Sequence, residues 1–227
     1  YYVNTSYDRW KIISFFNTNK ICKIISPDKI QDKNLDPWVQ SVSINTGKIS
    51  DKHKIFEIGQ RIPKNTTQIW DILAKKKIYC SIWGTMNSLF KKNKHLKLYF
   101  PDPWNYQAEA HPEKFNNFLE LPKYYAQNYL DFKNFYFLKL IFNFGLNIFF
   151  ISFFFYFLKN LNFFLKILIN SGFTNYNLFF IFDIISLILF KKELKKNSSD
   201  FGLIFLNSFA HFQHINWDEK KNEKVFF

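Results

Sequence analysis

The sequence predicts an α/β fold, with a mostly parallel sheet flanked by helices and a Phe-rich helical segment inserted into it. Three observations support this prediction: short apolar runs bounded by turn residues, a helical pattern followed at once by such a run, and polar residues directly after the last run. At 227 residues the chain is long enough for one large domain or two small ones. Because it starts at Tyr1 rather than Met, we expect it to be a piece of a longer protein.

The stretch from Asp36 to Ile55 is punctuated by Pro37 and by the pair Thr46-Gly47. Between these two points, residues 38–44 fit the start of a helix or a strand. Three hydroxyl groups lie here, on Ser41, Ser43 and Thr46. A hydroxyl becomes a nucleophile only when a base or a metal activates it. A structural role is therefore the simpler interpretation.

A helix is predicted over residues 65–77, where Asn65 and Gln68 resemble a capping pair. Its apolar stripe at helical spacing consists of Ile69, Ile72 and Leu73. A buried strand, residues 78–83, follows at once and is ended by Gly84. A helix followed immediately by a strand is typical of α/β folds.

A second strand is predicted over residues 96–100, and the sequence Pro101-Asp102-Pro103 stops it sharply. Beyond it, no charged residue occurs from Leu140 to Leu158. These nineteen residues fall within the range of roughly 17–25 that spans a membrane, although polar residues interrupt them. We favour buried or half-buried helices of a soluble domain, with a membrane hairpin over residues 140–190 as the alternative.

Lys and Arg outnumber Asp and Glu by 31 to 18, which gives a formal charge of +13. Such an excess fits nucleic acid, an anionic membrane surface or phosphorylated substrates. Only Arg9 and Arg61 supply guanidinium groups, which nucleic-acid sites use for bidentate contacts, so no nucleic-acid partner is expected. We attribute the abundance of Lys and Phe to codon bias. Cys22 and Cys80 form no disulfide framework, and we expect small buried apolar residues.

A candidate metal site follows the predicted strand Leu203–Leu206. Asn207 offers an oxygen at the strand tip, and His211 and His214 are three residues apart, which places them on one face of a helical turn. One oxygen and two imidazoles suit a borderline metal such as zinc. The alternative is a surface or half-buried histidine pair without a ligand.

Two segments before the insertion resemble the alkaline phosphatase superfamily of phosphatases, phosphodiesterases and sulfatases. The sequence Asn45-Thr46-Gly47 followed by His53 is similar to the superfamily's turn that reads Thr-Gly and then, a few residues later, His-Gly. Lys54 stands where the second Gly is usual. Residues 69–88, IWDILAKKKIYCSIWGTMNS, resemble the helix–strand unit that follows this turn in these enzymes.

A third segment, Leu206 to His214, is similar to the phosphodiesterase-branch motif in which a metal-binding Asp precedes a Gly-His pair. Asn207 falls on that Asp, Ala210 on the Gly and His211 on the metal-binding His. The superfamily's nucleophile position is occupied by Pro37, so the resemblance assigns no nucleophile. It implies Asn207 and His211 as ligands of one metal, with His214 as a ligand, a supporting partner or a substrate contact.

The resemblance implies a metal-dependent phosphoester or sulfate-ester hydrolase, present as an incomplete piece that uses zinc or manganese on an anionic small-molecule ester. Two alternatives are an inactive binding relative of the same fold and a membrane-associated protein with a hairpin at residues 140–190. We expect residues 1–103 to start the α/β domain, 104–198 to form a helical insertion or cap, and 199–227 to return to the core. A cytoplasmic location is expected, with membrane association as the alternative.

Overall fold

The computed structural model describes residues 36–128, 136, 138–140, 142–143, 154–159, 161–162, 165–166, 169 and 175–208. The helices and strands in these ranges are α2 (Pro37–Thr46), α3 (Ser50–His53), α4 (Ile69–Lys75), β1 (Cys80–Thr85), β2 (Leu96–Pro101), the 3-10 helix η2 (Glu113–Phe115), α5 (Asn116–Gln127), α7 (Phe154–Lys159), α9 (Asn175–Lys196) and β3 (Phe201–Ile204).

The three strands form a parallel sheet in the order β2-β1-β3, which confirms the predicted α/β class. Cys80 at the start of β1 pairs with Leu96 on one side and with Phe201 on the other. The carboxyl ends of all three strands therefore meet at one edge of the sheet. In α/β folds this edge is where ligands bind.

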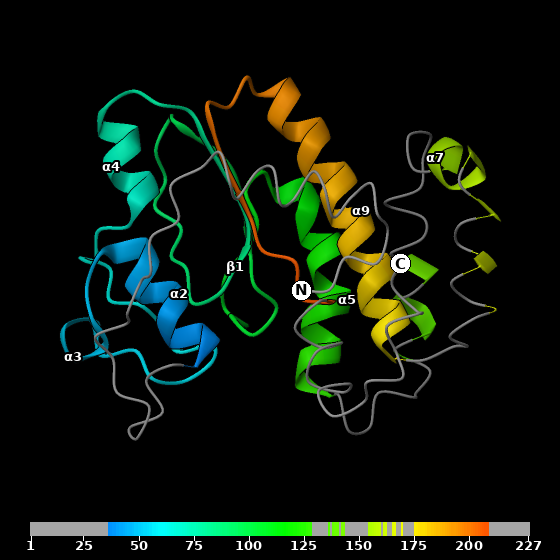
Figure 1. Cartoon of the computed structure of the whole chain (residues 1–227), viewed down its shortest axis with the longest axis horizontal. Helices are drawn as coiled ribbons and strands as arrows, with labels where there is room; N and C mark the ends of the chain where they lie inside the picture. Colours follow the sequence, from blue (N-terminus) through cyan, green and yellow to red (C-terminus); the bar gives the residue numbers. More distant parts are fainter. Residues whose placement is uncertain are drawn as a thin grey trace, which may run out of the picture.

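One face of the sheet is covered by α5 and α9 (Figure 1). Its core is centred on Trp83 of β1, which stacks on Phe100 of β2 with ring centroids 4.1 Å apart. Phe118 from α5 and Phe190 from α9 pack against the Trp83 ring. The two helices thus share one aromatic cluster with the strands, and residues predicted to belong to an insertion complete the core.

The opposite face is covered by α4 through Trp70, which is fully buried against Cys80 and Ile82. The predicted stripe is wrong in two of its members, since Ile69 is 38% exposed and Ile72 is 48% exposed. The large indole of Trp70 and the side chain of Leu73, three residues later, make the buried face instead.

Element boundaries shift by a few residues from their predicted places. The helix α4 begins at Ile69, and its cap is Gln68, whose N–H donates to the Asp71 carboxylate at 2.9 Å. Gly84 does not end β1; it has φ +68 and lies at a register irregularity inside the strand. The last strand is Phe201–Ile204, two residues before the predicted Leu203–Leu206.

The buried position of Cys80 is confirmed, and burial, with the nearby Asp200 charge, raises the pKa of its thiol to about 11. Cys22 and most of Leu140–Leu158 lie outside the described residues. Within the ranges that the structure describes, no helix has the length and apolar character needed to cross a membrane.

Candidate functional site

The carboxyl edge of the sheet brings together residues from segments far apart in the sequence. The Ser41 hydroxyl of α2 donates to the backbone carbonyl of Met86, just after β1, at 3.0 Å. Beyond β3, the Phe205 carbonyl lies so close to Gly84 that a Cβ there would come within 3.0 Å of it. Helix α2 and the chain that leads to Asn207 therefore both contact the end of β1.

Asp102 ties the loops at this edge together. Its carboxylate is 1% exposed and accepts three backbone N–H groups, from Asn87 at 3.0 Å, Trp104 at 3.1 Å and Asn105 at 3.2 Å. Burial raises the pKa of Asp102 to about 6, although these N–H donors act in the opposite direction. Asp102 thus joins the loop after β1 to the loop after β2.

The Asn87 side chain extends this network to the segment before α4. Its Oδ1 accepts the Gly59 N–H at 2.8 Å, and its Nδ2 donates to the Glu57 carbonyl at 2.9 Å. A Cβ at Gly59 would lie 2.4 Å from the Trp104 carbonyl oxygen. The two backbones approach so closely that only glycine fits at position 59. This contact and the Asn87 hydrogen bonds hold the loops at the carboxyl edge together.

A serine and a histidine meet in the turn between α2 and α3. The Ser43 Oγ lies 3.0 Å from His53 Nε2, while His53 Nδ1 accepts the N–H of Ile55 at 3.0 Å. Because a backbone N–H can only donate, the neutral imidazole carries its proton on Nε2 and donates to Ser43. His53 is therefore oriented to fix the turn rather than to take a proton from the serine.

Left-handed backbone occurs at both ends of this turn. Gly47 ends α2 with φ 66° and ψ 21°, and its N–H donates to the Ser43 carbonyl at 2.9 Å. Lys54 ends α3 with φ 57° and ψ 32°. Such a conformation is ordinary for glycine and uncommon for lysine.

Asn207, the first of the predicted metal ligands, lies half-buried three residues after β3. The loop that carries it is held by Asp183 of α9, whose carboxylate accepts the Ser208 N–H at 2.7 Å. Burial raises the pKa of Asp183, against hydrogen bonds from Ser208 and Asn207 that lower it. The other two predicted ligands, His211 and His214, lie outside the described residues.

The described part of the chain contains no group of three His, Cys, Asp or Glu side chains placed to hold a metal ion. Of the predicted metal set, it supplies the neutral amide of Asn207 alone. That amide fits a metal site only together with the two histidines, because a single neutral oxygen is a poor site for a divalent cation.

A cavity of about 750 Å³ lies on the β2 side of the sheet, between the segments around residues 88–92 and 105–113. Two cationic side chains, Arg61 and Lys92, line it with two acidic ones, Glu109 and Glu113. It borders β2 through Tyr99, whereas Asn207 follows β3, on the opposite side of β1. The predicted metal residue and this cavity are thus separate features.

Comparisons with protein-family models, with curated proteins and with solved structures return no match.

Sequence reasoning missed the two buried aspartates. In the sequence, Asp102 is the middle residue of the strand-ending Pro101-Asp102-Pro103, and Asp183 is a single charge within an apolar stretch, so neither was assigned a role. Asp102 follows an apolar strand, and Asp183 lies within an apolar helix. A carboxylate buried among apolar residues is costly unless it accepts hydrogen bonds. That placement was the available signal, and the donors proved to be backbone N–H groups of loops distant in sequence.

Proposed function

We propose that this chain is part of a metal-dependent phosphoester or sulfate-ester hydrolase of the alkaline phosphatase type. The observation that supports it best is the turn after α2, where Gly47 and Lys54 both have left-handed backbone. These are the two positions at which the resemblance expects glycine. Lys54 departs from the pattern in residue type but has the backbone conformation that glycine favours.

The carboxyl edge supplies a second line of support. Polar residues after parallel strands are where α/β enzymes assemble their sites, and here α2 and the segment leading to Asn207 both reach the end of β1. In the proposed site Asn207 and His211 are ligands of one zinc or manganese ion. His214 is a ligand, a supporting partner or a substrate contact. When bound, paired metals would activate a nucleophile and stabilise the leaving oxygen.

The residues of α2 support a second candidate function. Pro37, at the first turn of α2, has no side-chain nucleophile. The Ser41 hydroxyl donates to the Met86 carbonyl, and the Ser43 oxygen accepts a hydrogen bond from His53 Nε2–H. These features favour, as the second candidate, a relative that keeps the fold and binds an anionic ester without hydrolysing it.

The test is His211→Ala in the complete protein, with zinc and manganese content and the hydrolysis of a nitrophenyl phosphodiester and a nitrophenyl sulfate as readouts. We expect both the bound metal and the hydrolysis to fall by at least roughly tenfold. The matched control is His95→Ala, since His95 precedes β2 at the amino edge of the sheet. Unchanged metal and unchanged hydrolysis in His211→Ala would remove His211 from the site.

The same preparation separates the two candidates. A hydrolase binds metal and turns over one of the esters, whereas the binding relative retains the ester analogue without releasing nitrophenol. A protein that holds neither metal nor ester would contradict both.

A further inference from the structure

Residues 132–169, the Phe-rich segment, have a composition unlike the rest of the chain. Thirteen of the 31 phenylalanines lie in these 38 residues, which are about a sixth of the chain. Codon bias acts on the whole sequence and does not explain this concentration. The segment also carries four lysines and no acidic residue.

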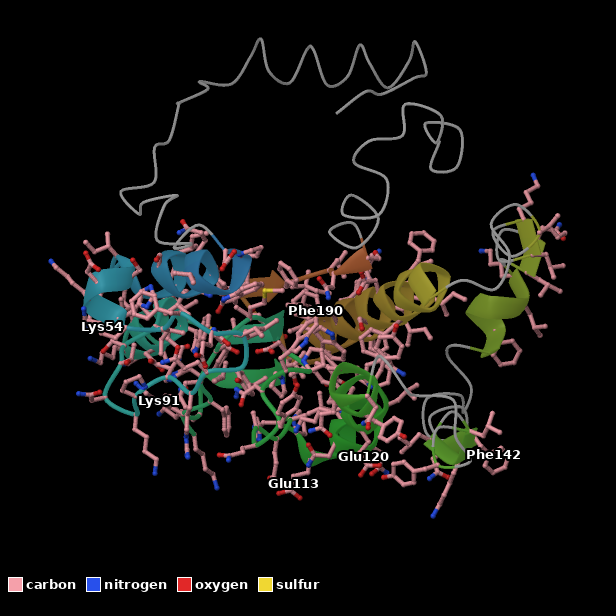
Figure 2. The ribbon with its side chains drawn as sticks, turned by 90° about the horizontal axis from the view of Figure 1, so that it is seen from below. Lys54, Lys91, Glu113, Glu120, Phe142 and Phe190 are labelled. Atoms are coloured by element: carbon pink, nitrogen blue, oxygen red, sulfur yellow. The ribbon has the colours of Figure 1, made fainter. Side chains whose placement is uncertain are left out.

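The described apolar side chains of the Phe-rich segment are mostly exposed. Phe142 and Phe155 are each 65% exposed, and Ile169 is 78% exposed. The others above a third exposed are Tyr136, Leu138, Leu158 and Leu165. Figure 2 shows Phe142 at the outer end of the molecule, whereas Phe190 points into its middle. Exposed apolar groups gathered in one segment mark an interaction surface.

Exposed lysines accompany these apolar side chains. Lys139, Lys159 and Lys166 are all exposed, and they flank or follow the uncharged run Leu140–Leu158. A long aliphatic lysine stem lies along apolar surface while its ammonium group stays at the polar boundary. Apolar and aromatic groups beside lysines, with no carboxylate among them, match the chemistry of a bilayer interface that contains anionic lipid.

We propose that the Phe-rich segment docks on the surface of an anionic lipid membrane, with its exposed phenylalanines and leucines in the acyl boundary and its lysines at the lipid phosphates. The described residues of this segment, including α7 (Phe154–Lys159), lie on the far side of α9 from the sheet (Figure 1). The inference does not rest on the proposed hydrolase: vesicle binding and ester hydrolysis are separate measurements, and either can fail alone.

The experiment is co-sedimentation of the 227-residue chain with vesicles of phosphatidylcholine alone and of phosphatidylcholine with phosphatidylglycerol. We expect at least about tenfold stronger binding to the anionic vesicles, and a loss of that preference at high salt. The double variant Phe142→Ser with Phe155→Ser weakens binding by about tenfold or more. The triple variant Lys139→Glu, Lys159→Glu and Lys166→Glu abolishes the anionic preference.

Matched controls use exposed residues elsewhere on the chain. Ile44→Ser with Ile72→Ser, at positions 76% and 48% exposed, leaves vesicle binding unchanged. Circular dichroism of every variant verifies that the fold is kept. Equal binding to neutral and anionic vesicles would overturn the proposal. So would absence of vesicle binding together with self-association that Phe142→Ser and Phe155→Ser remove, because the surface would then pair with protein.

Discussion

Phenylalanine has opposite surroundings in two regions of this protein. In the α/β body, residues 36–128 and 175–208, Phe190 is 4% exposed and packs on Trp83. In the Phe-rich segment, Phe142 is 65% exposed. The two side chains are chemically identical, so the sheet and its covering helices make the difference. Phenylalanine content by itself therefore says little about where a core lies.

The body also has directional constraints that complement its apolar packing. Asp102, Asn87 and Gly59 join three loops through hydrogen bonds to backbone groups. A buried carboxylate satisfied in this way specifies one arrangement of the loops, because any displacement leaves polar groups unpaired. In the Phe-rich segment most of the described apolar side chains instead face outward, whereas Leu140 is buried at 4% exposed.

We expect the largest effect from replacing phenylalanine with alanine, and the same substitution in each region compares the two directly. Phe190→Ala removes a ring from the aromatic cluster between α9 and the sheet, and it should lower the free energy of unfolding by about 3–5 kcal/mol. Phe142→Ala, on an exposed side chain, should change it by less than about 0.5 kcal/mol. Urea unfolding followed by tryptophan fluorescence measures both. Equal losses would mean that Phe142 belongs to the same core.

A pH titration isolates the loop network of the body. The pKa of Asp102 is raised from 3.8 to about 6 in the folded state, so the folded protein binds the extra proton. The free energy of unfolding should then fall as pH rises from about 4 to 6, by about 3 kcal/mol. Asp102→Asn removes this part of the fall, although it leaves the Asn87 N–H without its acceptor.

Asp51→Asn is the control for that titration, because Asp51 is an exposed carboxylate in α3. Its curve should keep the wild-type fall. Asp183, whose pKa is also raised, contributes in the same direction, so the Asp102→Asn curve becomes shallower without becoming flat. A fall of the same size in Asp102→Asn and in the wild type would show that Asp102 does not retain the proton.

The sheet was predictable because its strands obey local rules. Residues 78–83 and 96–100 are short apolar runs bounded by turn residues, and the structure has strands within two residues of both. The buried face of α4 was not predictable from spacing. Ile69 and Ile72 fit a helical stripe as well as Trp70 does, and only the sheet beneath selects Trp70. Local pattern sets the type of an element, and tertiary contact sets its face.

The site was less predictable than the fold. The sequence places Asn207 after a strand, and the structure agrees, because an apolar run ended by a polar pair is a local signal. The Asp102 carboxylate accepts N–H groups from the loop after β1 and from the loop after β2. No local sequence pattern predicts that these two loops meet. Likewise, the orientation of the Ser43–His53 pair depends on Ile55 N–H.

Two glycines, Gly59 and Gly47, test whether close backbone contacts stabilise the α/β body. Gly59 and Gly47 both have positive φ, +71 and +66, but only at Gly59 would a Cβ meet backbone, the Trp104 carbonyl oxygen at 2.4 Å. Gly59→Ala should lower the free energy of unfolding by more than about 2 kcal/mol, and Gly47→Ala by about 1 kcal/mol. Thermal melting compares the two variants. Equal shifts of Tm would mean that the close contact between Gly59 and the Trp104 carbonyl contributes nothing to stability.

The smallest effect concerns backbone conformation alone, where no burial is involved. Lys54 is exposed and left-handed, so Lys54→Gly should raise the free energy of unfolding by about 0.5–1 kcal/mol, since glycine adopts this conformation without a Cβ clash. Lys52→Gly, two residues earlier within α3, should lower it by a similar amount, because there glycine only loosens a right-handed helix. Opposite signs in urea unfolding would identify Lys54 as a lysine in a glycine position, and a decrease in both variants would argue that the turn before residue 55 is not left-handed in solution.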